Sequence, residues 1–168
     1  MRDVITASPL SSSAIAEYAE RVAEHHQVFG DRNRADLESL VRTLGGRIDV
    51  SSSFLAEEAL TVRGPRDFTV HLPPMTSNRR DRFTIAHELG HYFLHYLQPG
   101  HEDPLLFGRG QRNRAETQAN YFAASLLMPA ERFRRAFAQC GGDMWELADE
   151  FDVSPRAAEV RAQVLGLS

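Results

Sequence analysis

The chain opens with two stretches in which apolar residues recur every three or four positions, the spacing of an amphipathic helix. The first follows Ser12 or Ser13, either of which can cap a helix, and its apolar positions are Ile15, Ala19, Val22 and Ala23. The second stops at Gly45 and Gly46, and its apolar positions are Leu37, Leu40, Val41 and Leu44. We therefore expect two helices within residues 1–45.

The pattern changes after Gly46 to short runs rich in Val, Ile, Phe and Thr, separated by Ser or Gly-Pro punctuation. In the third of these runs Phe68, Val70 and Leu72 alternate with more polar residues, so one face of a strand there is apolar. The sequence predicts a small three-stranded antiparallel sheet from the runs RIDVS (47–51), ALTVRG (59–64) and DFTVHL (67–72).

Helical spacing then returns and continues to the end of the chain. The predicted helices cover residues 81–97, 114–128 and 130–142, followed by two more that are joined by a tight turn at DVSP. The order of helices, small sheet and helices indicates an α+β fold with a C-terminal helical bundle. We expect one domain over residues 1–168, divided into N-terminal helices (1–45), a sheet with the site helices (46–128) and C-terminal helices (129–168) that include a helix-turn-helix-like hairpin.

Composition excludes several classes of protein. The net charge of −4 gives no basic footprint, which argues against nucleic acid as the direct partner. Cys140 is the single cysteine, so no intramolecular disulfide can form and a reducing compartment is expected. No apolar run approaches the roughly 18 residues of a membrane helix, and the first residues lack the apolar core of a signal peptide. We expect a cytoplasmic protein with no membrane partner.

The stretch RFTIAHELGHYFLH carries the clearest chemistry in the chain. On a helix with about 100° per residue, His91 lies roughly 40° from His87, and Glu88 lies about 100° from it, while the apolar residues occupy the opposite arc. Two histidines at i and i+4 can both bind one zinc ion, and Glu88 can act as a general base on a water whose pKa the metal lowers. The alternative is an amphipathic helix whose polar face holds histidines without a metal.

A catalytic zinc also needs a third protein ligand. Glu116 in the next predicted helix is 25 residues past His91, far enough for the chain to return antiparallel and complete the site. A glutamate is more often a solvated surface charge, and that reading stays open for Glu116 on its own. Asn120 lies on the same side of this helix, where it either orients a ligand or holds the start of the helix, and we favour the structural role.

Two blocks of the sequence, RFTIAHELGHYFLH and ETQANYFAASLLMP, closely resemble the signature blocks of the ImmA/IrrE family of metallopeptidase-like proteins. The preceding FTVHLPPMTSNRRD and the ending LADEFDVSPRAAEVRAQVLGL are similar to the family's layout, and the similarity covers most of the chain from Gly46 onward. Matched position by position, His87, His91 and Glu116 correspond to the metal ligands and Glu88 to the catalytic glutamate. Gln118 stands where family members often have an acidic residue.

The resemblance implies a gluzincin-like minimal zinc peptidase fold. It also implies a phage, mobile-element or stress-response regulator that acts on a helix-turn-helix repressor by cleavage or displacement. We therefore expect a zinc (Zn²⁺) metalloendopeptidase with the HExxH motif that serves as an antirepressor. One alternative is a non-proteolytic, zinc-containing regulator that binds a repressor or DNA directly. Another is DNA binding by the terminal hairpin, whose second helix carries few side chains suited to base edges.

Three further expectations concern the surroundings of the site. A substrate strand would pair with an exposed edge of the sheet, for which DFTVHL is the first choice. The charged run SNRRDR leads into the site helix and either lines the approach to the cleft or is ordinary surface basicity. An oxyanion donor is also expected, and the candidates for it are Tyr92, Tyr121, His95 and His71. His95, on the face of the helix that carries the site, could instead contact a ligand or be a half-buried histidine with its hydrogen bonds satisfied.

Overall fold

The computed structural model describes residues 5–53, 55–108 and 113–168. The expected α+β fold is confirmed, with helices before and after a small sheet. The elements are α1 (Ser12–His25), α2 (Leu37–Thr43), β1 (Gly46–Val50), β2 (Ala59–Gly64), β3 (Asp67–Leu72), α3 (Asn78–His91), the π-helical segment η1 (Tyr92–Leu97), β4 (Leu105–Gly108), α4 (Arg114–Leu127), α5 (Ala130–Gln139), α6 (Met144–Phe151) and α7 (Pro155–Val164).

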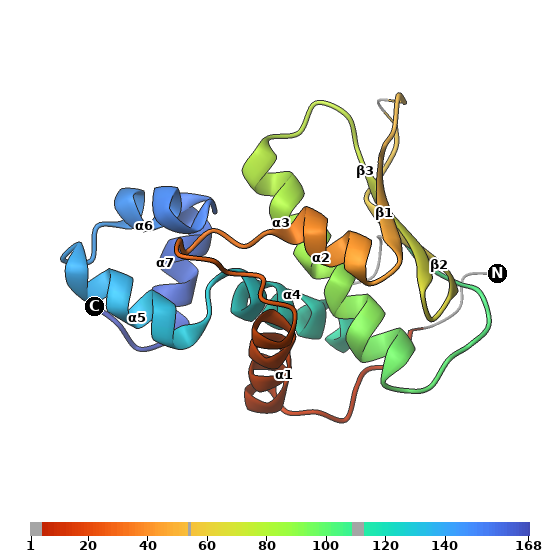
Figure 1. Ribbon diagram of the computed structural model, residues 1–168, viewed down its shortest axis with the longest axis horizontal. Coiled ribbons are helices and arrows are strands. Elements are labelled where there is room, and N and C mark those ends of the chain that lie inside the picture. The colour runs from red at the N-terminus through yellow and green to blue at the C-terminus, as the bar shows by residue number, and fades with distance from the viewer. Residues whose placement is uncertain (1–4, 54, 109–112) are drawn as a thin grey trace.

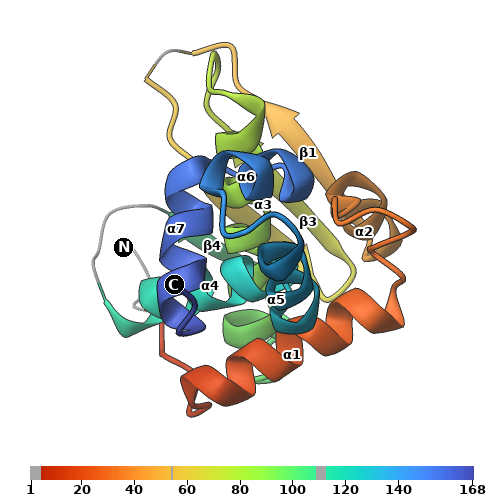
Figure 2. The same cartoon turned by 90° about the vertical axis from the view of Figure 1, so that its left-hand side faces the viewer.

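Two layers flank the pair of central helices. In Figure 1 the sheet lies at one end of the molecule and α5, α6 and α7 lie at the other, with α3 and α4 between them. Figure 2 shows α1 running across the base of this arrangement, where it packs on α4. The Tyr18 ring of α1 lies 6.1 Å from the Phe122 ring of α4 and 5.8 Å from the Phe93 ring. None of the helices described in the structure has the length and apolarity needed to cross a membrane.

Both N-terminal helices form as predicted, with one shift at a cap. Ser11, one residue before the two expected candidates, caps α1 by accepting a hydrogen bond from the amide of Ala14 at 3.1 Å. Asp36 caps α2 in the same way. A side-chain oxygen at the N-cap satisfies an amide that has no partner within the helix.

The prediction of a three-stranded antiparallel sheet is wrong in the number of strands and in the direction of one pair. Among the described residues the sheet has four strands in the order β1-β3-β2-β4, and the β1–β3 pair is parallel. β2 and β3 form a hairpin, and β1 pairs with the far strand of that hairpin, so the two paired strands run the same way. β4 lies between the predicted helices 81–97 and 114–128, where the sequence predicted no strand, because a run of four residues gives only a weak alternation signal.

The sheet buries one face against α3, as the alternation predicted. Phe68 and Val70 of β3 are fully buried and face Val62 and Leu60 of β2, their cross-strand partners. β3 is an inner strand, so the expectation that a substrate pairs with DFTVHL is wrong. β1 and β4 are the outer strands of the sheet that the structure describes.

The predicted helix over residues 81–97 is two elements. α3 begins three residues earlier, where Ser77 caps it through the amide of Arg80, and it ends at His91. The backbone then continues as the wider π-helical segment η1. Periodicity in sequence could not distinguish the two, because a single π turn changes the spacing of side chains only slightly.

An arginine cluster holds the start of α3 against the C-terminal helices. Asp152, which ends α6 with a left-handed backbone (φ 54°), accepts hydrogen bonds from Arg79 Nε at 3.2 Å and from Arg34 Nε at 2.9 Å. Arg82 is buried and lies 3.4 Å from the same carboxylate. Arg79 and Arg82 of the run SNRRDR therefore join two parts of the fold.

Candidate metal centre

The imidazole rings of His87 and His91 lie on one face of α3, and both point at Glu116 of α4. Nε2 of His87 lies 3.0 Å from Oε2 of Glu116, and Nε2 of His91 lies 2.8 Å from Oε1. One ligand atom from each of the three residues can be chosen so that all lie within 4.8 Å of one another. The three residues that the sequence singled out as ligands therefore converge on one point.

Local structure explains this convergence. Residues at i and i+4 stand one above the other on a helix, so both rings leave α3 on the same side. Asn113 caps α4 by accepting from the amide of Glu116 at 3.0 Å, which fixes the first turn from which the carboxylate projects. Gly90 faces α4, and a Cβ there would lie 3.0 Å from Cα of Ala119. The missing side chain allows the two helices to approach closely.

Glu88 lies beside the three converging residues but is not one of them. It is 4 % exposed, and its Oε2 has no hydrogen-bond partner among the residues that the structure describes. A pocket of about 190 Å³ is lined by Glu88, the three converging side chains, and Phe107 and Gly108 of β4. Burying a carboxylate oxygen without a hydrogen-bond partner costs folding free energy. Its position at the edge of this pocket therefore indicates a chemical role for Glu88.

Burial and neighbouring charges shift the pKa values in the site. Burial raises the pKa of Glu88 to about 8, with the Glu116 and Glu58 carboxylates adding to the effect and His87 opposing it. Burial would also raise the pKa of Glu116, but hydrogen bonds to His87 and His91 outweigh it and hold that pKa far below its usual range. Burial alone would lower the pKa of His87, yet its contacts with Glu116 and the charge of Glu88 raise it.

The donor set fits a divalent cation of the zinc type. Two imidazole nitrogens and one carboxylate oxygen are ligands that zinc takes in sites with an open fourth position. Metal–ligand bonds of about 2.0–2.1 Å in a tetrahedron separate neighbouring ligand atoms by roughly 3.3 Å. The observed contacts of 2.8 and 3.0 Å are within a few tenths of an ångström of that separation. His87, His91 and Glu116, whose ligand atoms all lie within 4.8 Å of one another, could therefore hold a metal ion.

The outer nitrogens of both rings also have partners. Nδ1 of His87 lies 2.7 Å from Oδ1 of Asn120, so Asn120 contacts a candidate ligand, as in the less favoured of the two roles expected for it. Nδ1 of His91 lies 2.9 Å from Nδ1 of His95, which is 2 % exposed. The sequence singled out His95 only by its place on the site face, because the contact depends on how η1 continues α3.

The four candidates for an oxyanion donor lie apart from the metal pocket as far as it is described. The Tyr92 hydroxyl donates to the carbonyl of Pro65, and His71 is hydrogen-bonded to Thr61 at 2.9 Å. His95 is occupied with His91, and Tyr121 lines a different cavity. None of them lines the pocket around Glu116 in the described part of the chain.

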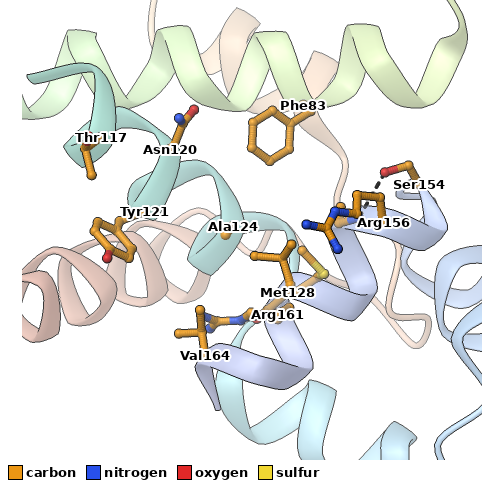
Figure 3. A pocket seen from close by; sticks show the side chains of 12 residues that line it. Phe83, Thr117, Asn120, Tyr121, Ala124, Met128, Ser154, Arg156, Arg161 and Val164 are labelled. Atoms are coloured by element: carbon orange, nitrogen blue, oxygen red, sulfur yellow. Dashed lines mark hydrogen bonds between the residues drawn. The ribbon is translucent and has the colours of Figure 1, made fainter. Parts of the chain in front are cut away.

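That second cavity is an apolar groove of about 410 Å³ between α4 and α7 (Figure 3). Phe83 of α3 closes one end, and Figure 3 shows Tyr121, Ala124 and Met128 facing Val164 and Arg161 across it. Asn120 borders both this groove and the metal pocket, so the two cavities adjoin. Several apolar residues of the groove are partly exposed, among them Tyr121 at 38 %, Val160 at 40 % and Val164 at 58 %.

A comparison with protein-family models matches residues 51–163 to the IrrE N-terminal-like domain, Peptidase_M78. The match spans both candidate ligand helices and the hairpin of α6 and α7. No curated protein matches the chain significantly.

Solved structures share the fold. One is a protein described as a Mycobacterium tuberculosis transcriptional regulator, with a TM-score of 0.59 and 18 % sequence identity. The alignment covers 86 % of this chain and 44 % of that chain, so the present chain spans less than half of the regulator's length. At this identity the likeness extends to the fold alone.

Proposed function

Because the chain belongs to the IrrE N-terminal-like family, Peptidase_M78, we propose that it is a zinc-dependent metallopeptidase that inactivates a helix-turn-helix transcriptional repressor by cleavage. The observation that carries this proposal is the convergence of His87, His91 and Glu116 beside the buried carboxylate of Glu88. Two imidazoles, a carboxylate and an adjacent base are the parts that metal-assisted hydrolysis of a peptide requires.

Zinc is the metal that these ligands favour, with His87 and His91 binding through Nε2 and Glu116 through its carboxylate. When bound, zinc supplies a lowered pKa for a water molecule and polarises the carbonyl of the peptide. The outer contacts of the rings, to Asn120 and to His95, hold both imidazoles in orientation.

Glu88 is the proposed general base. Its Oε2 has no hydrogen-bond partner among the described residues and borders the pocket, so it can receive a proton from the attacking water. A cation bound nearby favours the ionised carboxylate that a base needs, against the burial that raises its pKa. The water oxygen joins the carbonyl carbon, the C–N bond breaks, and Glu88 transfers the proton to the departing amine.

The substrate segment is proposed to pair with β4. β4 is an outer strand of the described sheet, and its Phe107 and Gly108 border the metal pocket. An extended peptide that adds to a strand edge gains main-chain hydrogen bonds and lies parallel to that edge. A segment on β4 would therefore bring its own peptide bond past Glu88 and the candidate metal ligands.

The groove between α4 and α7 is proposed to take an apolar side chain of that segment. It adjoins the metal pocket at Asn120 and is lined largely by apolar side chains such as Phe83, Ala124 and Met128 (Figure 3). Its volume of about 410 Å³ exceeds that of any single side chain, so it has room for a Leu, Met or Phe. A large apolar residue close to the scissile bond is thus the expected preference.

The partner class rests on the family. The ImmA/IrrE resemblance implies a repressor as the target, and the similar structure cited above is described as a transcriptional regulator. The test begins with a screen of helix-turn-helix repressors for one that is cleaved when this chain is present.

The deciding experiment compares wild type with Glu88→Gln in zinc content and in cleavage of that repressor. We expect equal zinc content, because Glu88 is not among the converging ligands, and loss of cleavage by about 100-fold or more. Cleavage that persists in Glu88→Gln would exclude the proposed base. Relief of repression that persists while cleavage is absent would instead favour the non-proteolytic regulator.

A further inference from the structure

A buried chain of hydrogen bonds runs from the backbone of Ser8 to the candidate metal ligand His91. The amide of Ser8 lies 2.9 Å from Oε1 of Gln118, and Nε2 of Gln118 lies 2.8 Å from the carbonyl of Ser8. Oε1 of Gln118 also lies 2.9 Å from Nε2 of His95, whose Nδ1 lies 2.9 Å from Nδ1 of His91. All four residues are buried, with exposures of 2–4 %.

The backbone of Ser8 fixes the direction of this chain. A backbone N–H can only donate and a carbonyl can only accept, so the Gln118 amide has one possible orientation, with its oxygen toward the Ser8 amide. The Gln118 oxygen accepts only, and therefore Nε2 of His95 must carry the hydrogen of that contact. This assignment needs no assumption about a metal.

The same donor-to-acceptor direction continues through the imidazole rings of His95 and His91. Nε2 of His95 carries the hydrogen donated to Gln118, and its Nδ1 faces Nδ1 of His91, so one of these two Nδ1 atoms donates and the other accepts. A neutral His95 with its hydrogen on Nε2 has only a lone pair on Nδ1, so His91 must donate from its own Nδ1. Nε2 of His91 is then left with a lone pair, the form in which imidazole binds a metal.

We propose that Ser8, Gln118 and His95 are positioning residues of the metal centre, which hold His91 in the tautomer that binds a cation through Nε2. None of the three would bind the metal ion itself. His95 contacts His91 directly, and Ser8 and Gln118 act on His91 through His95. The segment before α1 thereby becomes part of the site, although Ser8 lies 110 residues from Gln118 and outside the matched family region. His87 is held in the same tautomer by a different acceptor, Oδ1 of Asn120.

The tautomers can be read directly in the wild-type protein. In ¹⁵N-labelled full-length protein loaded with zinc, long-range ¹H–¹⁵N spectra distinguish a protonated ring nitrogen from one with a lone pair. We expect His95 to be protonated at Nε2 alone and His91 at Nδ1 alone. A hydrogen on Nδ1 of His95 would reverse the chain and overturn the proposal, whatever the enzyme activity.

Substitutions in this series of hydrogen bonds can be tested through their effect on zinc affinity. Gln118→Leu removes the acceptor at similar volume, and we expect its dissociation constant for zinc, measured by competition with a chromophoric chelator, to rise about 10–100-fold. Gln118→Glu retains an oxygen for the Ser8 amide and His95, but it removes the donor to the Ser8 carbonyl and places a carboxylate beside His95 that favours the charged ring. This variant should therefore not restore the zinc affinity of wild type. A folded Gln118→Leu protein that binds zinc as tightly as wild type would overturn the proposal.

The Ser8 backbone has its own matched pair of variants. Ser8→Pro removes the amide hydrogen and should weaken zinc binding, whereas Ser8→Ala keeps that amide and loses only the hydroxyl contacts to Gln98 and to the amide of Leu10. Equal zinc affinity in these two variants, with both folded by circular dichroism, would remove Ser8 from the site. Because every readout is zinc binding or a ring tautomer, these experiments fail independently of the proposed peptidase activity.

Discussion

Gly90 of α3 and Ala119 of α4 are in backbone contact: a Cβ on Gly90 would lie 3.0 Å from the Cα of Ala119 and 3.1 Å from its carbonyl oxygen. His91 follows Gly90 directly, and Glu116 lies one turn before Ala119. The distance between the two helices at this contact therefore sets the distance between the imidazoles and the carboxylate that face each other across them.

Gly90→Ala should weaken zinc binding by moving α4 away from α3. The backbone of Ala119 must shift by a few tenths of an ångström, an overpacking cost of about 1–3 kcal/mol that the better helix propensity of alanine offsets by about 1 kcal/mol. We expect a higher dissociation constant for zinc and a small loss in the free energy of unfolding. Gly30→Ala, where a Cβ meets nothing within 4 Å, is the control and should change neither.

Glu116→Gln should remove most of the zinc affinity while leaving the fold intact. The carboxylate is the only anionic member of the converging group, and the amide that replaces it binds zinc poorly, so we expect a loss of more than about 100-fold. Excess zinc should raise the melting temperature of wild type, since a ligand at 1,000 times its dissociation constant stabilises by about 4 kcal/mol. The variant should show no such rise, while Glu131→Gln on the exposed side of α5 should behave as wild type.

Asp152→Asn should destabilise the protein near neutral pH by about 1–3 kcal/mol, because Arg82 is buried and would lose its nearby charge. Asparagine also tolerates the left-handed backbone at this position, so the change tests the charge. Urea unfolding measures the effect. Asp149→Asn, which removes a carboxylate that is 79 % exposed and also pairs with Arg79, should cost less than about 1 kcal/mol.

The same aspartate gives a pH dependence with a defined sign. Burial alone would raise the pKa of Asp152, but the hydrogen bond from Arg34 and the charge of Arg82 outweigh it, so the pKa is lower in the folded protein. The stability that it contributes is present above the ordinary aspartate pKa of about 4 and is lost as the pH falls toward the folded value. The difference between wild type and Asp152→Asn should therefore shrink below about pH 4; a constant difference would contradict this account.

Val160→Asp should impair recognition of substrate without affecting the metal. Val160 is 40 % exposed on the α7 side of the groove, so a carboxylate there should be tolerated by the fold but should disfavour an apolar side chain. With a peptide that carries Leu or Phe near the cleaved bond, we expect KM to rise about tenfold with zinc content unchanged. Trp145→Ala, at a 73 % exposed position outside the groove, is the matched control.

The sequence predicted the two histidines of the candidate site correctly as neighbours, because their relative geometry is set within one helix. His87 and His91 stand one helical turn apart, so their common direction follows from the helix alone. Glu116 required one further step, a second helix that returns to the first, and the structure does bring its carboxylate to both rings. Had that side chain pointed to solvent, the candidate metal site would have lacked a third donor.

Other parts of the fold gave no local signal. β4 is only four residues long, and the parallel pairing of β1 with β3 depends on which side of a hairpin the first strand joins. The change from α to π geometry after His91 alters the spacing too little to be visible in a pattern. The role of Asp152 depends on three arginines from two distant segments.

The sequence by itself determined the order of most elements, the apolar faces and the shared direction of His87 and His91, because each follows from the periodicity of a helix or a strand. Only the tertiary structure decided that β4 borders the pocket and that Ser8 reaches Gln118 across 110 residues. Contacts of that kind form when distant segments pack together, and no spacing along the chain encodes which backbone amide will meet which side chain. The local sequence thus identifies the candidate ligands, while the orientation of their side chains depends on the whole fold.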